Sequence, residues 1–398
     1  MEYEEYPEGL DRDFTTPALD RITSKFADLD AIKEKFGGVH VCLGVDGYVD
    51  SLYSLVATRR SADEFDIMGS MNTFAQWVLA AAGSSCNIER VLKKLIGGGF
   101  GPNTARAVAT LGASVDLIGA LGKPDEVFIN SLPSNVSMHS LNDPGSTCAL
   151  EFDDGKVMLT DFANINGITW DHIQEKLGRD QVIDMLEKAD AIGQGHWSLV
   201  SHLSEIWHAW AEEIFPSLSQ KNRYFYVDVA DMTKRTPGQI KGMIKELEGI
   251  NAIPGCKAVM SCNDKEAIQI SQVLDDDCEI ATFTDYYTNA EKMMAHMDIS
   301  MLVFHSPYFA MATTKDAMWH VREAYTSKPK FTTAAGDHFN GGCLVALASG
   351  FEPDEALLIA NATTAHFVRT GQSPSVDLVS AFLGNYQTYL YDDIDSII

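Results

Sequence analysis

The chain has 398 residues, 45% of them hydrophobic, which is enough to bury a sizeable core and argues against disorder. Its 30 basic and 56 acidic side chains leave a net charge of −26. This charge argues against a surface for nucleic acid or acidic membranes, because both need clustered lysine and arginine. It leaves a nucleotide ligand open, since one local pocket can be positive on an acidic protein.

The seven cysteines are odd in number and scattered, and no C-x-x-C pair occurs. Neither a zinc site nor a disulfide framework is therefore indicated. The acidic N-terminal residues lack the apolar region of a secretory signal, and no segment has the apolar length needed to span a bilayer. We expect a soluble, cytoplasmic protein with reduced thiols, and neither a membrane nor a nucleic acid as partner.

Short β-rich runs alternate with helical patterns along most of the chain. The first helical pattern covers 16–36, in an acidic N-terminal extension over 1–38. Strands are predicted at 39–45, 115–122, 223–231, 256–263 and 299–306, and helices at 102–111, 172–186, 203–214, 236–247, 264–274, 314–325 and 354–368. This alternation predicts a parallel sheet covered by helices on both faces.

Two β-prone segments interrupt the alternation. Residues 48–59 follow the first strand, and residues 146–163 contain Asp154-Gly155 between two β-prone runs, which is a hairpin signal. The two segments are able to form a small second sheet. A lid over a site and a plain surface hairpin are both open interpretations.

The segment FTTAAGDHFNGG, residues 331–342, carries the strongest chemical signal. The small residues Ala334, Ala335 and Gly336 lead into Asp337, and an apolar run follows. This pattern predicts a turn that opens a helix, where free N–H groups and the helix dipole favour a phosphate. Asp337 at that position could take a proton from a hydroxyl group. An ordinary helix start, with Asp in the first turn, is the alternative.

A glycine-rich segment precedes the predicted helix 102–111. Gly98 and Gly99 suggest a hinge and a close backbone approach to a ligand. The segment matches neither G-x-G-x-x-G nor the Walker A pattern. Asn103 is either a ligand-binding residue or only the cap of its helix.

Polar residues also follow two of the predicted strands. Asp46 and Asp50 come after the first strand, where paired carboxylates could hold sugar hydroxyls or could be solvated turn residues. Asn263 and Glu266 follow the strand at 256–263. They resemble a capping box, and the functional alternative is that Glu266 orients magnesium-bound water near a phosphate.

Taken in order, these motifs resemble those of the ribokinase-like (PfkB) carbohydrate kinases. The segment at 96–122 resembles the first family signature, and 332–347 resembles the second. SCNDKEA at 261–267 matches the family's N-x-x-E motif, and 361–377 is similar to its nucleotide-proximal C-terminal helix and turn. The resemblance implies a single ribokinase-like α/β domain over 1–398. This domain would be a three-layer α/β/α sandwich with a mainly parallel central sheet and a small β lid.

The resemblance also implies roles for individual residues. Asp337 would be the catalytic base, beneath an anion hole made by the backbone N–H groups of 334–337. Asp50 and Asn103 would bind substrate hydroxyls, with Gly98 and Gly99 as the lid hinge. The remaining roles fall to Asn263 and Glu266 at magnesium and phosphate, and to Asn361 near the adenine. The lid in this family often mediates dimerisation, so a homodimer through the lid is expected.

Three features depart from the family pattern. Phe331 stands where an aspartate usually helps to bind a monovalent cation, so such a cation is doubtful. Residues 304–309 replace a glycine-bearing nucleotide loop, and the insert at 61–95 is long. We therefore predict a kinase that uses ATP and Mg²⁺ to phosphorylate a sugar, sugar derivative or nucleoside. The alternative is a ribokinase-like protein that binds such a ligand without efficient phosphoryl transfer.

Overall fold

A nine-stranded sheet forms the centre of the molecule in the computed structural model, which describes residues 6, 7, 9–274 and 280–398. Neighbouring strands are parallel, except that β13 is antiparallel to both β12 and β14. In spatial order the strands are β14 (Met318–Arg322), β13 (Phe309–Thr313), β12 (Met301–His305), β11 (Cys256–Asn263), β10 (Arg223–Asp228), β9 (Ala191–Gln194), β1 (His40–Gly44), β5 (Ser114–Gly119) and β6 (Val136–Ser140). The inner strands are buried along most of their length, as expected where helices cover both faces of a sheet.

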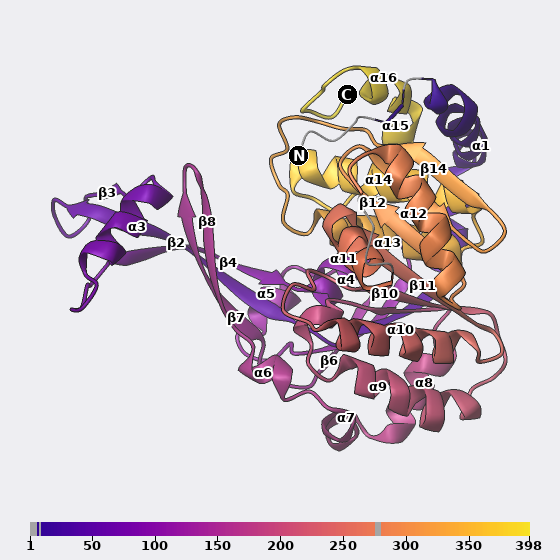
Figure 1. Cartoon of the computed structure of the whole chain (residues 1–398), viewed down its shortest axis with the longest axis horizontal. Helices are drawn as coiled ribbons and strands as arrows, with labels where there is room; N and C mark the ends of the chain where they lie inside the picture. Colours follow the sequence, from indigo (N-terminus) through magenta and orange to yellow (C-terminus); the bar gives the residue numbers. More distant parts are fainter. Residues whose placement is uncertain (1–5, 8, 275–279) are drawn as a thin grey trace.

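Two hydrophobic clusters cover the two faces of this sheet and define the helical layers (Figure 1). One layer contains α6 (Ala163–Asn166), α7 (Trp170–Leu177), α8 (Arg179–Lys188), α9 (Leu203–Ala209), α10 (Pro237–Asn251), α11 (Asp264–Leu274) and α12 (Phe283–His296). The other contains α1 (Thr16–Phe26), α2 (Leu29–Gly37), α4 (Phe100–Thr110), α5 (Glu126–Ile129), α13 (Ala335–Ala348), α14 (Pro353–Thr370), α15 (Val376–Gly384) and α16 (Tyr386–Tyr391). The predicted three-layer α/β/α architecture is confirmed.

A second, five-stranded sheet projects from one side of this body and forms the lid (Figure 1). Its strands are β2 (Tyr48–Arg59), β3 (Phe65–Ile67), β4 (Arg90–Gly98), β7 (Gly145–Phe152) and β8 (Gly155–Asp161), and α3 (Met71–Ala80) lies at its outer end. The predicted segments 48–59 and 146–163 supply β2, β7 and β8. The long insert supplies the rest, because β3, α3 and most of β4 come from 61–95.

Several predicted elements differ in the structure. The helix predicted over 314–325 is wrong, since β14 lies there and pairs with β13 in a hairpin. The short strands β6, β9 and β13 and helix α12 were not predicted. The helical pattern at 172–186 is broken at Gly178, which adopts a φ of +82°.

The N-terminal helices belong to the body and not to a separate extension. The pattern at 16–36 divides into two helices because Asp28 caps the second, with its Oδ1 accepting from the Ala31 N–H at 3.1 Å. Ala18, Leu19 and Ile22 of α1 are buried in the same cluster as α14 and α15. Residues 1–5 of the predicted extension lie outside the described residues. Among those described, no helix is both long and apolar enough to cross a membrane.

The close contact between α13 and α14 generates a prediction for stability. A Cβ added at Gly342 would lie 2.9 Å from both Ala360 Cα and Thr363 Oγ1, so Gly342→Ala forces the two helices apart. We expect a loss of about 1–3 kcal/mol in the free energy of unfolding, measured by denaturant titration. Gly249→Ala is the matched control, because that helical position opens onto free space and alanine there should stabilise by up to about 1 kcal/mol. Equal effects of the two substitutions would contradict the close contact.

Candidate active site

Five parallel strands of the main sheet end at one edge, and polar residues stand at or just after each end. These residues are Asp46 after β1, His196 after β9, Asp228 at the end of β10, Asn263 at the end of β11 and His305 at the end of β12. In open α/β sheets ligands bind outside this carboxyl edge. The N-terminus of α13 faces the same group, because Asp337 contacts His196.

The first turn of α13 has the geometry of an anion site. Ala334 adopts the left-handed conformation, with a φ of +69°, and no side chain caps the helix. Among the described residues, the N–H groups of Gly336 and Asp337 have no hydrogen-bond acceptor. The Ala335 N–H is different, since it donates to the Thr332 carbonyl at 3.3 Å. The free donors and the helix dipole together favour a negatively charged group at this turn.

His338 stabilises the unusual turn at Ala334. Its backbone N–H and its Nδ1 both contact the Ala334 carbonyl oxygen, at 3.1 Å and 2.7 Å. Its Nε2 lies 2.8 Å from Ser373 Oγ, and its ring stacks on Phe367. Burial lowers the pKa of His338 to about 4, so the ring is neutral at physiological pH.

The Asp337 carboxylate is buried and held by two side chains from other elements. Asn103 Nδ2, on α4, donates to Asp337 Oδ2 at 2.8 Å. His196 Nε2 lies 3.4 Å from Asp337 Oδ1. Burial raises the pKa of Asp337, but these two partners outweigh it and hold the pKa below its ordinary value. Asp337 is therefore ionised and able to accept a proton.

Asp46 binds the first backbone N–H groups of α4. It is fully buried, and its two oxygens accept the N–H groups of Phe100 and Gly101 at 2.8 Å each, at the start of α4. Its Oδ2 also lies 3.3 Å from His196 Nδ1. Asp46 thus holds the start of α4 from a fully buried position, and its role as a ligand for sugar hydroxyls stays a prediction.

Asp50, in contrast, lies at the junction between the body and the lid. It is on β2, paired with Ile96 of β4 and Thr147 of β7. A Cβ on Gly98 would come within 3.1 Å of Asp50 Oδ2, so these two predicted residues are neighbours. Burial raises the pKa of Asp50 above its ordinary value, although a hydrogen bond from Thr147 partly opposes this shift. Gly99, with a φ of +103°, leads from this junction into α4.

A second acidic group lies at the ends of β10 and β11. Asp228 Oδ2 accepts from Asn340 Nδ2 at 2.6 Å, and Asn340 Oδ1 accepts from the hydroxyls of Tyr226 and Ser261. Burial and then the negative charge of Asp228 raise the pKa of Glu266. Burial raises the pKa of Asp228 as well. Buried, mutually repelling carboxylates would be stabilised in their ionised form by a nearby cation.

Asn263 and Glu266 form the capping box that their spacing predicts. Asn263 Oδ1 accepts from the Glu266 N–H at 3.1 Å, and the Asn263 backbone N–H donates to Glu266 Oε2 at 2.9 Å. Asn263 Nδ2 donates to the other oxygen at 2.8 Å. Within the described residues, no three His, Cys, Asp or Glu side chains converge on a direct metal site. A contact of Glu266 to magnesium through water stays a prediction.

The atypical loop at 304–309 is a tight turn between β12 and β13. Ser306 Oγ accepts from the N–H groups of Tyr308 and Phe309, and Phe309 is buried against Phe283 and Tyr286. His305, at its start, stacks near Phe339 of α13, with ring centroids 4.7 Å apart. Burial lowers the pKa of His305 to about 4, so a neutral ring borders the α13 turn.

Asn361 is fully buried on α14, where its Nδ2 donates to the Tyr386 hydroxyl at 3.1 Å. Thr364, three residues further along the same helix, donates to the Ala335 carbonyl at the α13 turn. The role of Asn361 near an adenine stays a prediction. Phe331 packs against Gly371 and Phe367, so no carboxylate stands at its position.

The sequence analysis did not identify His196 or Arg106. His196 follows β9, a four-residue strand containing glycine, which has too short a pattern to be recognised. Arg106 lies one turn after Asn103 on α4, so helical spacing could have placed it on the same face. Burial lowers the pKa of its guanidinium, and the charge of Asp337 opposes that effect, so the two groups are electrostatically linked.

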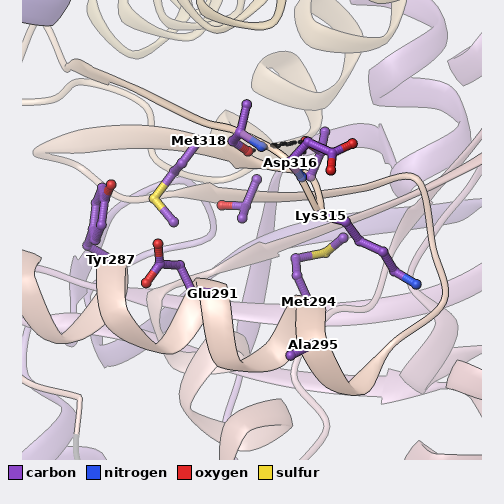
Figure 2. A pocket seen from close by; sticks show the side chains of 10 residues that line it. Tyr287, Glu291, Met294, Ala295, Lys315, Asp316 and Met318 are labelled. Atoms are coloured by element: carbon purple, nitrogen blue, oxygen red, sulfur yellow. Dashed lines mark hydrogen bonds between the residues drawn. The ribbon is translucent and has the colours of Figure 1, made fainter.

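A surface hollow of about 560 Å³ lies away from these residues, between α12 and the β13–β14 turn (Figure 2). Tyr287, Glu291 and Lys315 are among its lining side chains. Thr313 pairs with Leu302, whereas His305 pairs with Ala310 at the other end of the same hairpin. The hollow is therefore at the opposite edge of the sheet from Asp337.

Comparisons with known proteins agree with this geometry. A family model described as prokaryotic ketohexokinase matches residues 20–386. The chain belongs to this family. A ketohexokinase from Haloferax volcanii is 28% identical over 375 residues, which cover 93% of this chain and 98% of that protein. As a member of the family, the chain is a carbohydrate kinase, a phosphotransferase with an alcohol group as acceptor.

Solved structures show the same fold at low identity. A ribokinase from Thermotoga maritima is 16% identical, with a TM-score of 0.59 over 87% of this chain and 99% of that one. A ribokinase from Arabidopsis thaliana, solved with ribose and ATP, is 15% identical, with a TM-score of 0.61 over 87% and 98%. The predicted ribokinase-like fold and carbohydrate kinase family are thus confirmed.

The neutral state of His338 generates a prediction for pH dependence. The pKa of His338 in the folded protein, about 4, lies below the ordinary histidine value of 6.5. The contribution of the neutral ring to the free energy of unfolding is therefore complete above the ordinary pKa and is lost as the pH falls toward 4. We expect the unfolding free energy of the wild type to fall more steeply than that of His338→Gln between about pH 7 and about pH 5. The control is His208→Gln, at an exposed histidine, whose slope should match the wild type. Parallel curves for His338→Gln and the wild type would contradict a buried neutral ring.

Proposed function

We propose that this enzyme transfers a phosphoryl group from ATP to a hydroxyl of a ketohexose. The observation that carries the proposal is the buried Asp337 at the open N-terminus of α13, hydrogen-bonded to Asn103, in a member of the prokaryotic ketohexokinase family. The curated relative from Haloferax volcanii is named a ketohexokinase, which supports a ketohexose over a nucleoside.

The substrate would bind between the lid junction and α13. Asp50 and Asn103 offer an acceptor and a donor for sugar hydroxyls, and Gly98 leaves room beside Asp50. Asp337 would take the proton of the attacking hydroxyl as its oxygen bonds to the terminal phosphorus of ATP and the bond from that phosphorus to the bridging oxygen breaks, so that ADP leaves. The N–H groups of Gly336 and Asp337 would stabilise the negative charge on the transferred group. The lid, hinged at Gly98 and Gly99, would close to exclude water.

The residues at this edge fit a nucleotide with magnesium. The α13 turn suits a terminal phosphate, and Glu266 and Asp228 offer carboxyl groups whose ionised form a hydrated cation would favour. Magnesium, when bound, would neutralise charge on the phosphates. Two solved neighbours with the same fold support this assignment, one with ATP and the other with ATP and Mg²⁺. No carboxylate stands at Phe331, so we do not assign a monovalent cation.

Cellular location and the unit of function are part of the proposal. The six cysteines that the structure describes are free, which supports a reducing cytoplasm, where ATP is available.

We assign the function to one ribokinase-like unit made of the body and its lid. The small lid core of Leu55, Met68 and Leu150 is separate from the two body clusters.

The test is a substrate screen with purified protein. Fructose and other ketohexoses, ribose and adenosine would be offered with magnesium-ATP, and ADP release would be followed. We expect turnover with a ketohexose. Turnover with adenosine alone would refute the ketohexose assignment. Calorimetry showing no nucleotide binding at millimolar concentration would instead favour a sugar-binding protein without kinase activity.

The role of Asp337 predicts the outcome of one substitution. Asp337→Asn keeps the side-chain volume and should retain the fold and substrate binding, while kcat falls by about 10²–10⁴ because the general base is lost. Steady-state kinetics and sugar calorimetry measure the two effects. Asp298→Asn, at an exposed carboxylate beside Lys315, is the control and should keep wild-type kcat. Near-normal kcat in Asp337→Asn would remove the residue from the mechanism.

We predict a homodimer from the exposed apolar side chains of the lid. Leu79 on α3 and Met158 and Leu159 on β8 are 75%, 47% and 59% exposed, and the lid stands away from the body (Figure 1). Because a lone lid would leave these side chains in water, we expect a dimer that Leu159→Lys weakens at least tenfold, measured by sedimentation. Ile129→Lys, at an equally exposed site on the body, is the control and should stay dimeric. A monomeric wild type would contradict the prediction.

A further inference from the structure

His196 occupies the centre of the site, and its backbone is built to place it there. It adopts a left-handed conformation, with φ +49° and ψ +50°, which is uncommon for a residue with a side chain. The preceding Gly195 packs so tightly that a Cβ there would lie 1.9 Å from the Phe100 ring. Such strain persists only where the surroundings enforce it, and it concentrates at functional sites.

The imidazole of His196 lies between two carboxylates that come from different elements. Its Nδ1 is 3.3 Å from Asp46 Oδ2, and its Nε2 is 3.4 Å from Asp337 Oδ1. The ring packs edge-on against Phe100, with centroids 6.1 Å apart, and 22% of the side chain is exposed. A neutral imidazole has one N–H, whereas the protonated ring can donate to both carboxylates.

We propose that protonated His196 is the positioning residue of Asp337. It would orient the base and stabilise its negative charge while the buried Asp46 holds the ring from the other side. This inference rests on the proposed phosphoryl transfer and adds a member to its machinery. Asn103 donates a hydrogen bond to Asp337 Oδ2, and His196 Nε2 lies 3.4 Å from Oδ1, so each oxygen of the carboxylate has a polar neighbour.

The charges around His196 agree with a protonated ring. Burial lowers its pKa, but Asp337 and Asp46 outweigh burial and raise the pKa well above 6.5. Asp228 of β10 and Glu266 of α11 also interact electrostatically with the ring. These four groups, Asp46, Asp228, Glu266 and Asp337, are all acidic. Their combined field favours the imidazolium over the neutral ring.

The first experiment measures the protonation of His196 directly, without catalysis. The protein would be labelled with ¹⁵N at its histidines, and the His196 signal would be assigned by its loss in His196→Gln. In the wild type we expect His196 to remain protonated above neutral pH. In Asp337→Asn the titration should move to lower pH. A ring that is neutral throughout the neutral range in the wild type would refute the proposal, even if the enzyme is an active kinase.

The second experiment measures the effect of His196 on turnover. His196→Leu removes both the donor and the charge, and we expect kcat to fall about tenfold or more with little change in KM, since misplacement of a catalytic group affects the chemical step. His196→Gln restores a donor and should recover part of kcat. The acid limb of the kcat profile should move to higher pH in both variants, because Asp337 protonates more easily without the imidazolium.

Control variants and outcomes separate this inference from the proposed function. His208→Gln, at the exposed histidine of α9, should retain the wild-type kcat and pH profile. A rise in KM at constant kcat would show that His196 binds substrate and does not position the base. An inactive wild type would count against the proposed function, whereas the histidine titration would still decide the charge of His196.

Discussion

A buried carboxylate remains ionised only where donors and positive charge surround it, and Asp337 imposes this constraint on the whole site. The groups that satisfy it come from distant parts of the chain. Asn103 comes from α4, His196 from the end of β9, and the free N–H groups from the first turn of α13. The site therefore depends on how closely α13 packs against α4 and the sheet. Gly341 permits that approach, since a Cβ there would lie 2.8 Å from Ala107 Cβ.

The acidic side chains at the carboxyl edge of the sheet do not by themselves favour a negatively charged nucleotide. Asp228, Glu266 and Asp337 would together repel a polyphosphate. The helix dipole of α13 and the guanidinium of Arg106 offset part of this repulsion. Burial, and after it the neighbouring carboxylates, raise the pKa of Asp228 and of Glu266, so both groups would ionise more readily beside a cation. A hydrated divalent cation would supply the missing positive charge, which links metal binding to nucleotide binding.

The lid illustrates how an insertion can extend a fold without disturbing its core. β2 continues directly from the region after β1, and its first residues, Tyr48 to Asp50, pair with β4 and β7 close to the site. The insert adds β3 and α3 at the far end of this sheet, away from the body (Figure 1). The base of the lid around Asp50 and the apolar surface at its tip are therefore separate, and one can change without the other.

Local patterns were sufficient for much of the fold and for part of the site. Helix α11 occupies its predicted span, and β2 begins and ends where its β-prone residues do. The capping box of Asn263 and Glu266 was recognisable because its partners are three residues apart. The prediction at 314–325 failed because strand pairing with β13 overrides a weak helical pattern.

The amino-acid sequence by itself determined the alternation of strands and helices, the helix start at Asp337 and the family to which the chain is similar. Each of these is encoded in residues that are adjacent or one helical turn apart. Only the tertiary structure decided that His196 stands between Asp46 and Asp337, that Asp46 is used to hold α4, and that Asn361 is buried against Tyr386. These contacts join residues separated by 25 to 150 positions, and they leave no periodic signal, because they arise from the packing of whole elements around one sheet.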